Sequence, residues 1–144
     1  MIPDSIGDRL YLDSNVFIYA FENTPLFEQT ARAIFQRVAD GQAELFVSEL
    51  IYTEIMPVPL RDGRHDLLER YADFLQNTDG VTVLPLTSAI VLRTVSLRAQ
   101  HNLKTVDALH IATALEHGCS AFISNDQALK RVTDLPVFCL SQDF

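Results

Sequence analysis

Short apolar runs alternate along the chain with longer segments in which apolar residues recur every three or four positions. The short runs predict strands, and the periodic segments predict helices with one buried face. The expected strands are RLYL (9–12), AELFVS (43–48), VTVLP (81–85), SAFIS (120–124) and VFCL (137–140). The expected helices span 26–40, 62–76, 87–101, 105–118 and 125–132, and two more begin at Ser14 and Ser48.

Cap and breaker residues set the expected ends of these helices. Asp13 or Ser14 is suited to cap the first helix, because its side-chain oxygen can accept a hydrogen bond from a free N–H of the first turn. The helix that begins at Ser48 is expected to stop at Pro57 and Pro59, since proline lacks an N–H and restricts the residue before it. In the 87–101 helix, the residues expected to face mostly inward are Ile90, Val91, Val95 and Leu97.

The alternation of strands and helices indicates an α/β fold. Parallel strands joined by helical crossovers form a sheet that helices cover on both faces. We therefore expect a three-layer α/β/α sandwich with a parallel sheet of about five strands. The 144 residues fit one domain, and no linker, repeat or low-complexity segment divides residues 1–144.

Composition narrows the classes of protein to which the chain can belong. With 48% hydrophobic and 21% charged residues, it is typical of a globular domain. Its formal net charge of −8 argues against a protein that holds nucleic acid by a basic face alone, because phosphate contacts need Lys and Arg. The acidic excess is either a solvated, solubilising surface or a set of acids that serve a cation.

Cysteine content and the N-terminal sequence indicate a reduced, intracellular setting. The two cysteines, Cys119 and Cys139, lack the C-x-x-C spacing of a zinc site and are too few for a disulfide framework. The first residues, MIPDSIGD, have neither the basic nor the apolar region of a signal peptide. No apolar run approaches the roughly 20 residues needed to cross a bilayer. We therefore expect a cytoplasmic protein without membrane attachment.

Four acidic residues are placed where a parallel sheet binds ligands, outside the carboxyl ends of its strands. Asp13 follows the first strand directly, and Asp126 follows SAFIS across one residue. Glu54 lies in the helix after the second strand, and Asp107 lies in the first turn of the helix TVDALHIATAL. Two carboxylates about 4 Å apart repel by ~4 kcal/mol at an effective dielectric near 20. Such a cluster requires protonation or a cation, and hard oxygen ligands suit Mg²⁺ or Mn²⁺.

Each acid also has an ordinary structural interpretation. Asp107 can favour the dipole at a helix start, Asp126 can be a turn or cap residue, and Glu54 can be a surface acid. Asp13 is the hardest to explain in this way, because it ends a strand that is expected to be buried.

The imidazole and basic side chains near these acids are interpreted as structural. His110, three residues after Asp107, is expected to be a packed or capping residue rather than a ligand. Arg98 and Lys104 are expected to be solvated, with contact to phosphate as the alternative.

Three segments, YLDSNVFIYAFE, VSELIYTEI and TVDALHIATALEHGCSAFISND, resemble the signature blocks of PIN-domain ribonucleases, and above all the small VapC-type toxins of toxin–antitoxin pairs. The resemblance implies the α/β/α sandwich and an acidic pocket that binds Mg²⁺ or Mn²⁺. The catalytic and metal-binding acids that it implies are Asp13, Glu54, Asp107 and Asp126, with Asn15 and Ser124 in supporting positions. Ser124 stands where Thr is more usual in the family, and it keeps the hydroxyl.

The function implied by this resemblance is metal-dependent cleavage of RNA, in which a metal-activated water hydrolyses a phosphodiester. The implied partners are RNA, a small antitoxin with a basic segment, and a second copy of the chain in a homodimer. Three alternatives stay open: a PIN-fold RNA-processing nuclease unconnected with toxins, a catalytically inert PIN-fold binding module, and an aspartate-nucleophile phosphatase. The phosphatase is the weakest of them, because the position two residues after Asp13 holds Asn15 rather than a second acid.

Overall fold

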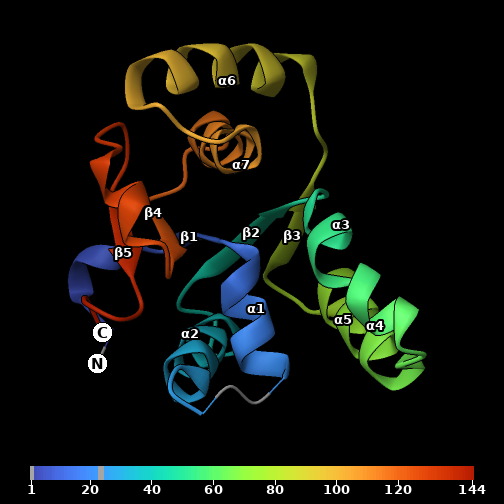
Figure 1. Cartoon of the computed structure of the whole chain (residues 1–144). Helices are drawn as coiled ribbons and strands as arrows, with labels where there is room; N and C mark the ends of the chain where they lie inside the picture. The colour runs from blue at the N-terminus through green and yellow to red at the C-terminus, as the bar shows by residue number, and fades with distance from the viewer. Residues whose placement is uncertain (1, 23–24) are drawn as a thin grey trace.

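Five strands pair side by side in one sheet, in the order β3-β2-β1-β4-β5, and every neighbouring pair is parallel (Figure 1). The structure is a computed structural model, and it describes residues 2–22 and 25–144. The strands are β1 (Arg9–Leu12), β2 (Glu44–Ser48), β3 (Val81–Leu84), β4 (Ala121–Ser124) and β5 (Val137–Cys139). The strands predicted from the apolar runs are confirmed, each end to within one residue.

Helices cover both faces of the sheet, as Figure 1 shows. One face carries α1 (Ser14–Phe21), α2 (Glu28–Ala39), α3 (Ile51–Ile55), α4 (Pro57–Arg61) and α5 (His65–Asn77), and the other carries α6 (Ser88–His101) and α7 (Thr105–Glu116). Two short 3₁₀ helices, η1 (Asp4–Ile6) and η2 (Gln127–Arg131), lie in the loops. The predicted three-layer α/β/α sandwich is therefore confirmed.

The strands separate two apolar cores, because successive side chains of a strand point to opposite faces of the sheet. Leu10 and Leu12 of β1 belong to the core shared with α1, α2 and α5, whereas Tyr11 belongs to the core shared with α6 and α7. β1 is the central strand, and these three residues are fully buried, as is usual inside a parallel sheet. Packing on both faces thus fixes the position of the end of β1.

The order of the strands reverses at β1. The chain runs from β1 outward to β2 and β3, and it later returns to the other side of β1 with β4 and β5. The carboxyl ends of β1 and β4 therefore meet at the place where open α/β sheets bind ligands. The backbone N–H of Asp13 donates to the carbonyl of Ile123 at 2.9 Å and ties these two ends together.

Two helices differ from the expectations. The helix expected from Ser48 begins only at Ile51 and ends at Ile55, before the prolines. Pro57 then begins a separate helix, α4, because the first residue of a helix needs no N–H for an intrahelical bond. Segment 125–132, expected to be a short helix, contains the 3₁₀ helix η2.

Helix α6 exposes more apolar surface than its sequence predicts. Ile90 and Leu97 are buried, as expected, but Val91 is 46% exposed and Val95 is 65% exposed. The inward orientation predicted for these two valines is wrong, because α6 carries apolar residues around much of its circumference and the periodicity does not single out the face that packs on α7. In the described ranges, no helix combines the length and the apolar character that spanning a membrane requires.

Candidate active site

Asp13 lies where β1 ends and α1 begins. It is the N-cap residue of α1, and its Oδ1 accepts a hydrogen bond from the Ser14 N–H at 2.8 Å. Its Oδ2 accepts a hydrogen bond from the Ser124 hydroxyl at 2.8 Å. Asp13 is only 7% exposed, and a buried carboxylate is costly without hydrogen bonds or a cation. The two hydrogen bonds hold both oxygens in place but leave the negative charge uncancelled.

The Ser124 hydroxyl connects Asp13 to Asp126. Ser124 is the buried last residue of β4, and its Oγ also accepts the backbone N–H of Asp126 at 3.0 Å. Asp126 is the N-cap residue of η2, with Oδ1 accepting a hydrogen bond from the Ala128 N–H at 2.9 Å. The side chain of Asp126 is exposed, so its carboxylate is open to a ligand.

Glu54 reaches the same edge of the sheet from α3. Its Oε2 accepts a hydrogen bond from the Ser14 hydroxyl at 3.2 Å. Its Oε1 lies 2.5 Å from Nε2 of His110, which belongs to α7. Ser14 therefore contacts both Asp13, through its backbone N–H, and Glu54, through its hydroxyl. In the same way, the Ser124 hydroxyl contacts both Asp13 and the backbone of Asp126.

His110 is 2% exposed and is held by hydrogen bonds that begin in the sheet. The backbone N–H of Ser48 donates to the Tyr11 hydroxyl at 3.1 Å, and this hydroxyl lies 2.6 Å from Nδ1 of His110. Burial raises the pKa of Tyr11 well above its ordinary value, so the hydroxyl keeps its proton and can donate to Nδ1. With Nδ1 accepting from Tyr11, Nε2 of His110 is the nitrogen that donates to Glu54. His110 is thus a packed residue that also positions Glu54.

Asp107 approaches from the first turn of α7 and is half-buried. Burial raises the pKa of this carboxyl, and the negative charges of Asp13 and Asp126 raise it further, while His110 and Lys104 oppose the shift. The three acids therefore lie within electrostatic reach of one another. The Asp107 carboxylate makes no hydrogen bond to the described residues, so its charge is compensated less than that of Asp13.

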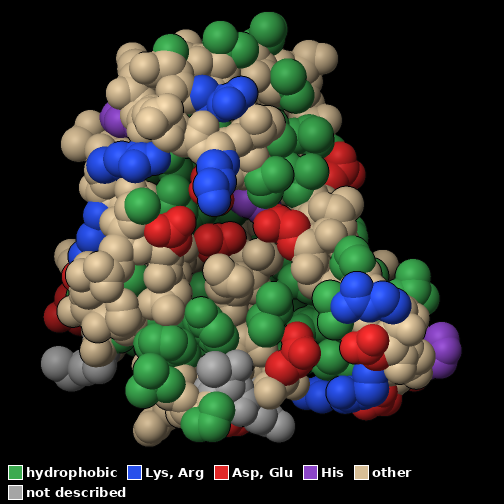
Figure 2. All heavy atoms as spheres, in the orientation of Figure 1, with side chains coloured by type: hydrophobic (Ala, Val, Ile, Leu, Met, Phe, Trp, Pro, Cys, Tyr) green, Lys and Arg blue, Asp and Glu red, His purple; other side chains and the backbone are tan. Residues whose placement is uncertain are grey.

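The structure brings the four predicted acids to one edge of the sheet. Among the described residues, candidate ligand atoms of Asp13, Glu54 and His110 lie within 4.8 Å of one another. Asp107 and Asp126 lie outside this compact group and border it. Figure 2 shows carboxylates gathered around a hollow between α7 and α1, with Lys and Arg side chains directly above them.

The sequence predicts the other residues of the site only in part. Asn15, expected to support the acids, is exposed in α1 and makes no side-chain hydrogen bond to the described residues. Tyr11 and Ser14 are site residues that the sequence does not predict. The sequence feature that could have identified Tyr11 is its hydroxyl in an otherwise aliphatic strand. The feature that could have identified the role of His110 is its place on the inward face of α7.

Comparison with known proteins assigns the chain to a family. A model of the PIN domain family matches residues 10–135. The chain belongs to the PIN domain family. The matched range includes all four acids and both predicted supporting residues. No curated protein matches the chain significantly in sequence.

Solved structures from toxin–antitoxin systems share this PIN fold. VapBC2 from Rickettsia felis, bound to a DNA fragment from its promoter, has a TM-score of 0.74 at 14% identity, covering 90% of this chain and 97% of that chain. DNA-bound VapBC from Salmonella typhimurium has a TM-score of 0.73 at 15% identity, covering 92% and 98%. VapC20 from Mycobacterium tuberculosis, a sarcin–ricin loop cleaving toxin, has a TM-score of 0.63 at 16% identity, covering 78% and 86%. At these identities the likeness is one of fold.

Replacing Tyr11 by Phe tests the hydrogen bonds that hold His110. Tyr11→Phe leaves the buried Ser48 N–H and His110 Nδ1 without their partner, so we expect the free energy of unfolding to fall by about 1–3 kcal/mol. Urea unfolding followed by circular dichroism measures the change. The control is Tyr52→Phe, which removes a hydroxyl without a partner among the described residues and should change the free energy by less than about 0.5 kcal/mol. Equal effects of the two substitutions would refute the role given to Tyr11.

Replacing Asp107 by Asn tests the repulsion among the acids. Because the fold raises the pKa of Asp107, its ionisation costs stability once the pH exceeds the ordinary value near 3.8. In EDTA at pH 7, Asp107→Asn should therefore raise the Tm, by up to about 4 °C. The gain should shrink as the pH falls toward 4, because Asp107 of the native protein then becomes neutral as well.

Thermal melts followed by circular dichroism at both pH values provide this measurement. Asp79→Asn, in the exposed loop before β3, is the matched control and should leave the Tm unchanged. A lower Tm for Asp107→Asn at pH 7 would show that repulsion does not dominate at this position.

Proposed function

We propose that this protein is a metal-dependent endoribonuclease and the toxin of a type II toxin–antitoxin pair. The observation that carries the proposal is the meeting of four carboxylates where the order of the strands reverses. Asp13 and Asp126 come from strand ends, whereas Glu54 and Asp107 come from helices. Helix capping explains such acids one at a time but gives no reason for their convergence, whereas metal-assisted chemistry does.

The donor set suits a hard divalent cation, Mg²⁺ or Mn²⁺, which prefers carboxylate oxygens. Asp13, Asp107 and Asp126 would hold the ion, and Glu54 would either hold it or orient a water. Both nitrogens of His110 are engaged, by Glu54 and by Tyr11, so we assign His110 a positioning role rather than that of a ligand.

A divalent cation bound there would lower the pKa of a coordinated water and stabilise negative charge on the phosphoryl oxygens. The residues of the chain supply the geometry. Ser124 fixes Oδ2 of Asp13, and His110 fixes Oε1 of Glu54. Oε2 of Glu54 has the longer bond, 3.2 Å to the Ser14 hydroxyl, so this oxygen is the one best suited to orient a water. Fixed carboxylates need no rearrangement when the substrate arrives.

RNA is the substrate class that we assign. The three signature segments resemble PIN-domain ribonucleases, and VapC20, a structural neighbour, is a sarcin–ricin loop cleaving toxin. A cation held by the acids also explains how a chain with a net charge of −8 can act on a polyanion, because the ion brings positive charge to the place of cleavage.

We further propose a small antitoxin as a partner. Two of the structural neighbours are VapBC assemblies bound to DNA. A basic segment of an antitoxin would complement the charge of the four acids. Coexpression with a small protein encoded next to this gene, followed by affinity capture, tests the pairing. Failure of every such neighbour to be captured would contradict the toxin assignment and leave the nuclease assignment standing.

We also propose a homodimer, formed through the exposed apolar face of α6. This face consists of Val91, Leu92 and Val95, with exposed fractions of 46%, 70% and 65%. Two copies that each carry a charge of −8 repel, so they meet most favourably on a face whose exposed side chains are largely apolar. Covering these side chains removes apolar surface from water.

Leu92→Glu should dissociate the homodimer, because dimerisation would bury a carboxylate in an apolar interface. Sedimentation velocity should give twice the chain mass for the native protein and the single-chain mass for the variant. Leu60→Glu is the matched control, since Leu60 is 62% exposed on α4 at a different face and should leave the dimer intact. A native protein that sediments as a monomer at micromolar concentration would contradict the proposal.

Asp13→Asn tests the proposed function directly. The substitution keeps the size of the side chain and the oxygen that caps α1, but it removes the charge that would hold the cation. Cleavage of a pool of structured RNAs in Mg²⁺, mapped by the ends produced, should fall by 100-fold or more, on the order of the loss of a principal catalytic group. Circular dichroism should show an unchanged fold. RNA cleavage at the native rate would refute the assignment of the pocket.

Metal-linked stability gives a second readout on the same two proteins. A ligand that binds only the native state stabilises it, by about 2.7 kcal/mol at 100 times its Kd. Mg²⁺ should therefore raise the Tm of the native protein and not that of Asp13→Asn. A native protein with neither cleavage nor a metal-dependent Tm would favour the inert binding module. Cleavage of phosphomonoesters with a trapped aspartyl phosphate would favour the phosphatase, and specific maturation of a precursor RNA would favour the processing nuclease.

A further inference from the structure

Three cations that form no ion pair with a described acid lie at one linker. The chain has 11 Lys and Arg against 19 Asp and Glu, so an acidic partner is abundant for every base. Six of these bases form ion pairs with carboxylates in the described part of the chain: Arg9, Arg32, Arg61, Arg64, Arg93 and Lys130. Three of the remaining five, Arg98, Lys104 and Arg131, gather at the α6–α7 linker, residues 102–104. No ion pair joins any of these three to a described acid.

Two of these cations are held in place by the linker itself. Nε of Arg98 donates to the Leu103 carbonyl at 3.1 Å, and Nη2 of Arg131 donates to the Asn102 carbonyl at 2.8 Å. Asn102 adopts the left-handed conformation, with φ 51° and ψ 49°, which turns the chain sharply between α6 and α7. A guanidinium has five N–H groups, so each arginine keeps further donors for a ligand. The side chains of all three cations are exposed.

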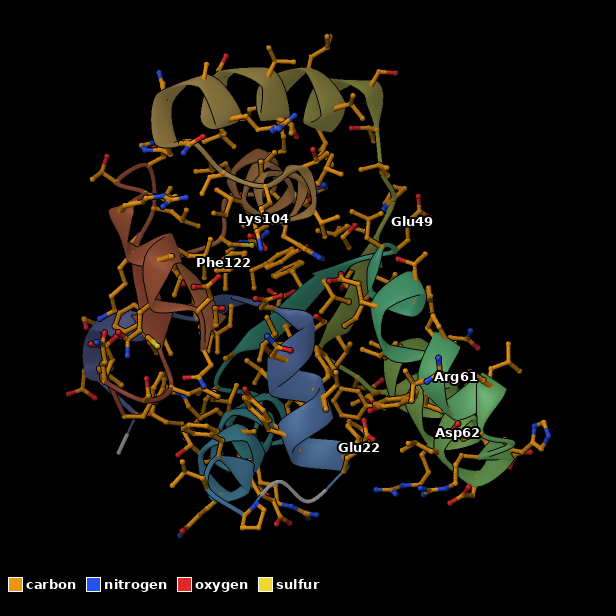
Figure 3. The ribbon with its side chains drawn as sticks, in the orientation of Figure 1. Glu22, Glu49, Arg61, Asp62, Lys104 and Phe122 are labelled. Carbon is orange, nitrogen blue, oxygen red and sulfur yellow. The ribbon has the colours of Figure 1, made fainter. Side chains whose placement is uncertain are left out.

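The cations share elements with the proposed catalytic acids. Lys104 is the N-cap residue of α7, which carries Asp107 in its first turn. Arg131 ends η2, which begins after Asp126. The positive charge of Lys104 acts on Asp107. Figure 3 shows Lys104 projecting from the start of α7 toward the carboxyl end of β1, where the acids gather.

The opposite side of the acid cluster has the other sign of charge. Glu54 of α3 lies there, and Glu49, just before α3, is exposed at the end of β2 (Figure 3). Oε1 of Glu49 accepts a hydrogen bond from the Leu86 N–H at 2.7 Å, and no ion pair joins Glu49 to a described Lys or Arg. A polyanion that reaches the acids is therefore attracted on the α7 and η2 side and repelled on the α3 side.

We propose that Arg98, Lys104 and Arg131 bind the backbone phosphates of RNA next to the phosphate that is cleaved. The proposal rests on the proposed ribonuclease function. It adds that the substrate strand lies on the α7 and η2 side of the acids. Guanidinium and ammonium groups recognise phosphate oxygens without reading bases. The contacts position RNA for cleavage and contribute affinity without sequence preference.

Salt dependence of RNA binding tests the proposal. The probe is a fluorescein-labelled single-stranded RNA of 12 nucleotides, bound to the full chain in EDTA and followed by anisotropy from 50 to 300 mM KCl. Each phosphate contact contributes about 0.7 to the slope of log Kd against log salt concentration. Arg98→Gln, Lys104→Gln and Arg131→Gln should each lower the slope by about this amount, and the triple variant by about 2. Glutamine removes the charge and keeps a hydrogen-bond donor.

Arg93→Gln is the matched control, because Arg93 lies on the same helix as Arg98 but is paired with Glu116 at 2.8 Å. It should leave the slope unchanged. Thermal melts of all variants check that the linker still folds. A triple variant with the native slope would overturn the proposal. A triple variant that keeps RNA binding but loses binding to an acidic peptide of equal charge would also overturn it, because the cations would then bind a protein partner.

Cleavage measured in parallel separates this proposal from the proposed function. If the native protein cleaves RNA in Mg²⁺ and the triple variant binds with the native slope, only the cation proposal fails. If the native protein cleaves no RNA but the triple variant binds RNA with a reduced slope, only the nuclease proposal fails. The proposal expects both cleavage by the native protein and a reduced slope in the triple variant.

Discussion

Parallel pairing of β1 with β4 puts the carboxyl ends of two strands side by side, and the site depends on this register. Asp13 follows one strand and Ser124 ends the other, so a single hydroxyl spans the distance between them. Helix α3 and the first turn of α7 then bring Glu54 and Asp107 to the same place. A shift of β4 by one residue would turn Ser124 to the other face and separate the acids.

Hydroxyl, backbone amide and imidazole groups, rather than Lys or Arg side chains, hold Asp13 and Glu54 in position. The hydrogen bonds to Asp13 and Glu54 come from serine hydroxyls, a backbone N–H and an imidazole. An arginine at the same place would also have fixed these carboxylates, but it would have cancelled their negative charge. The arrangement keeps the cluster negative and rigid at a cost in stability. Arg98, Lys104 and Arg131, which form no ion pair with a described acid, lie outside the cluster. This separation of charge suits the proposed binding of a cation and a polyanion.

Sequence patterns predict those parts of the molecule that depend on local chemistry. The five strands follow from their apolar runs, and Asp13 and Asp126 follow from their places at strand ends. The exposure of Val91 and Val95 is not predictable in this way, because the sequence of α6 offers more than one apolar face and tertiary packing selects among them. The link from Tyr11 through His110 to Glu54 is equally hidden, since it joins three segments whose proximity exists only in the folded sheet.

The hydrogen bond between Ser124 and Asp13 joins residues 111 positions apart in the chain. During synthesis the first strand emerges long before its neighbour β4, and domains complete their cores only when the last strands have left the ribosome. In a partly synthesised chain, Asp126 is therefore not yet in place beside Asp13, the hydrogen bond from Ser124 is absent, and β1 is not yet buried between two neighbouring strands. A protein whose proposed substrate is RNA is thus without its complete acid cluster until β4 and Asp126 have left the ribosome.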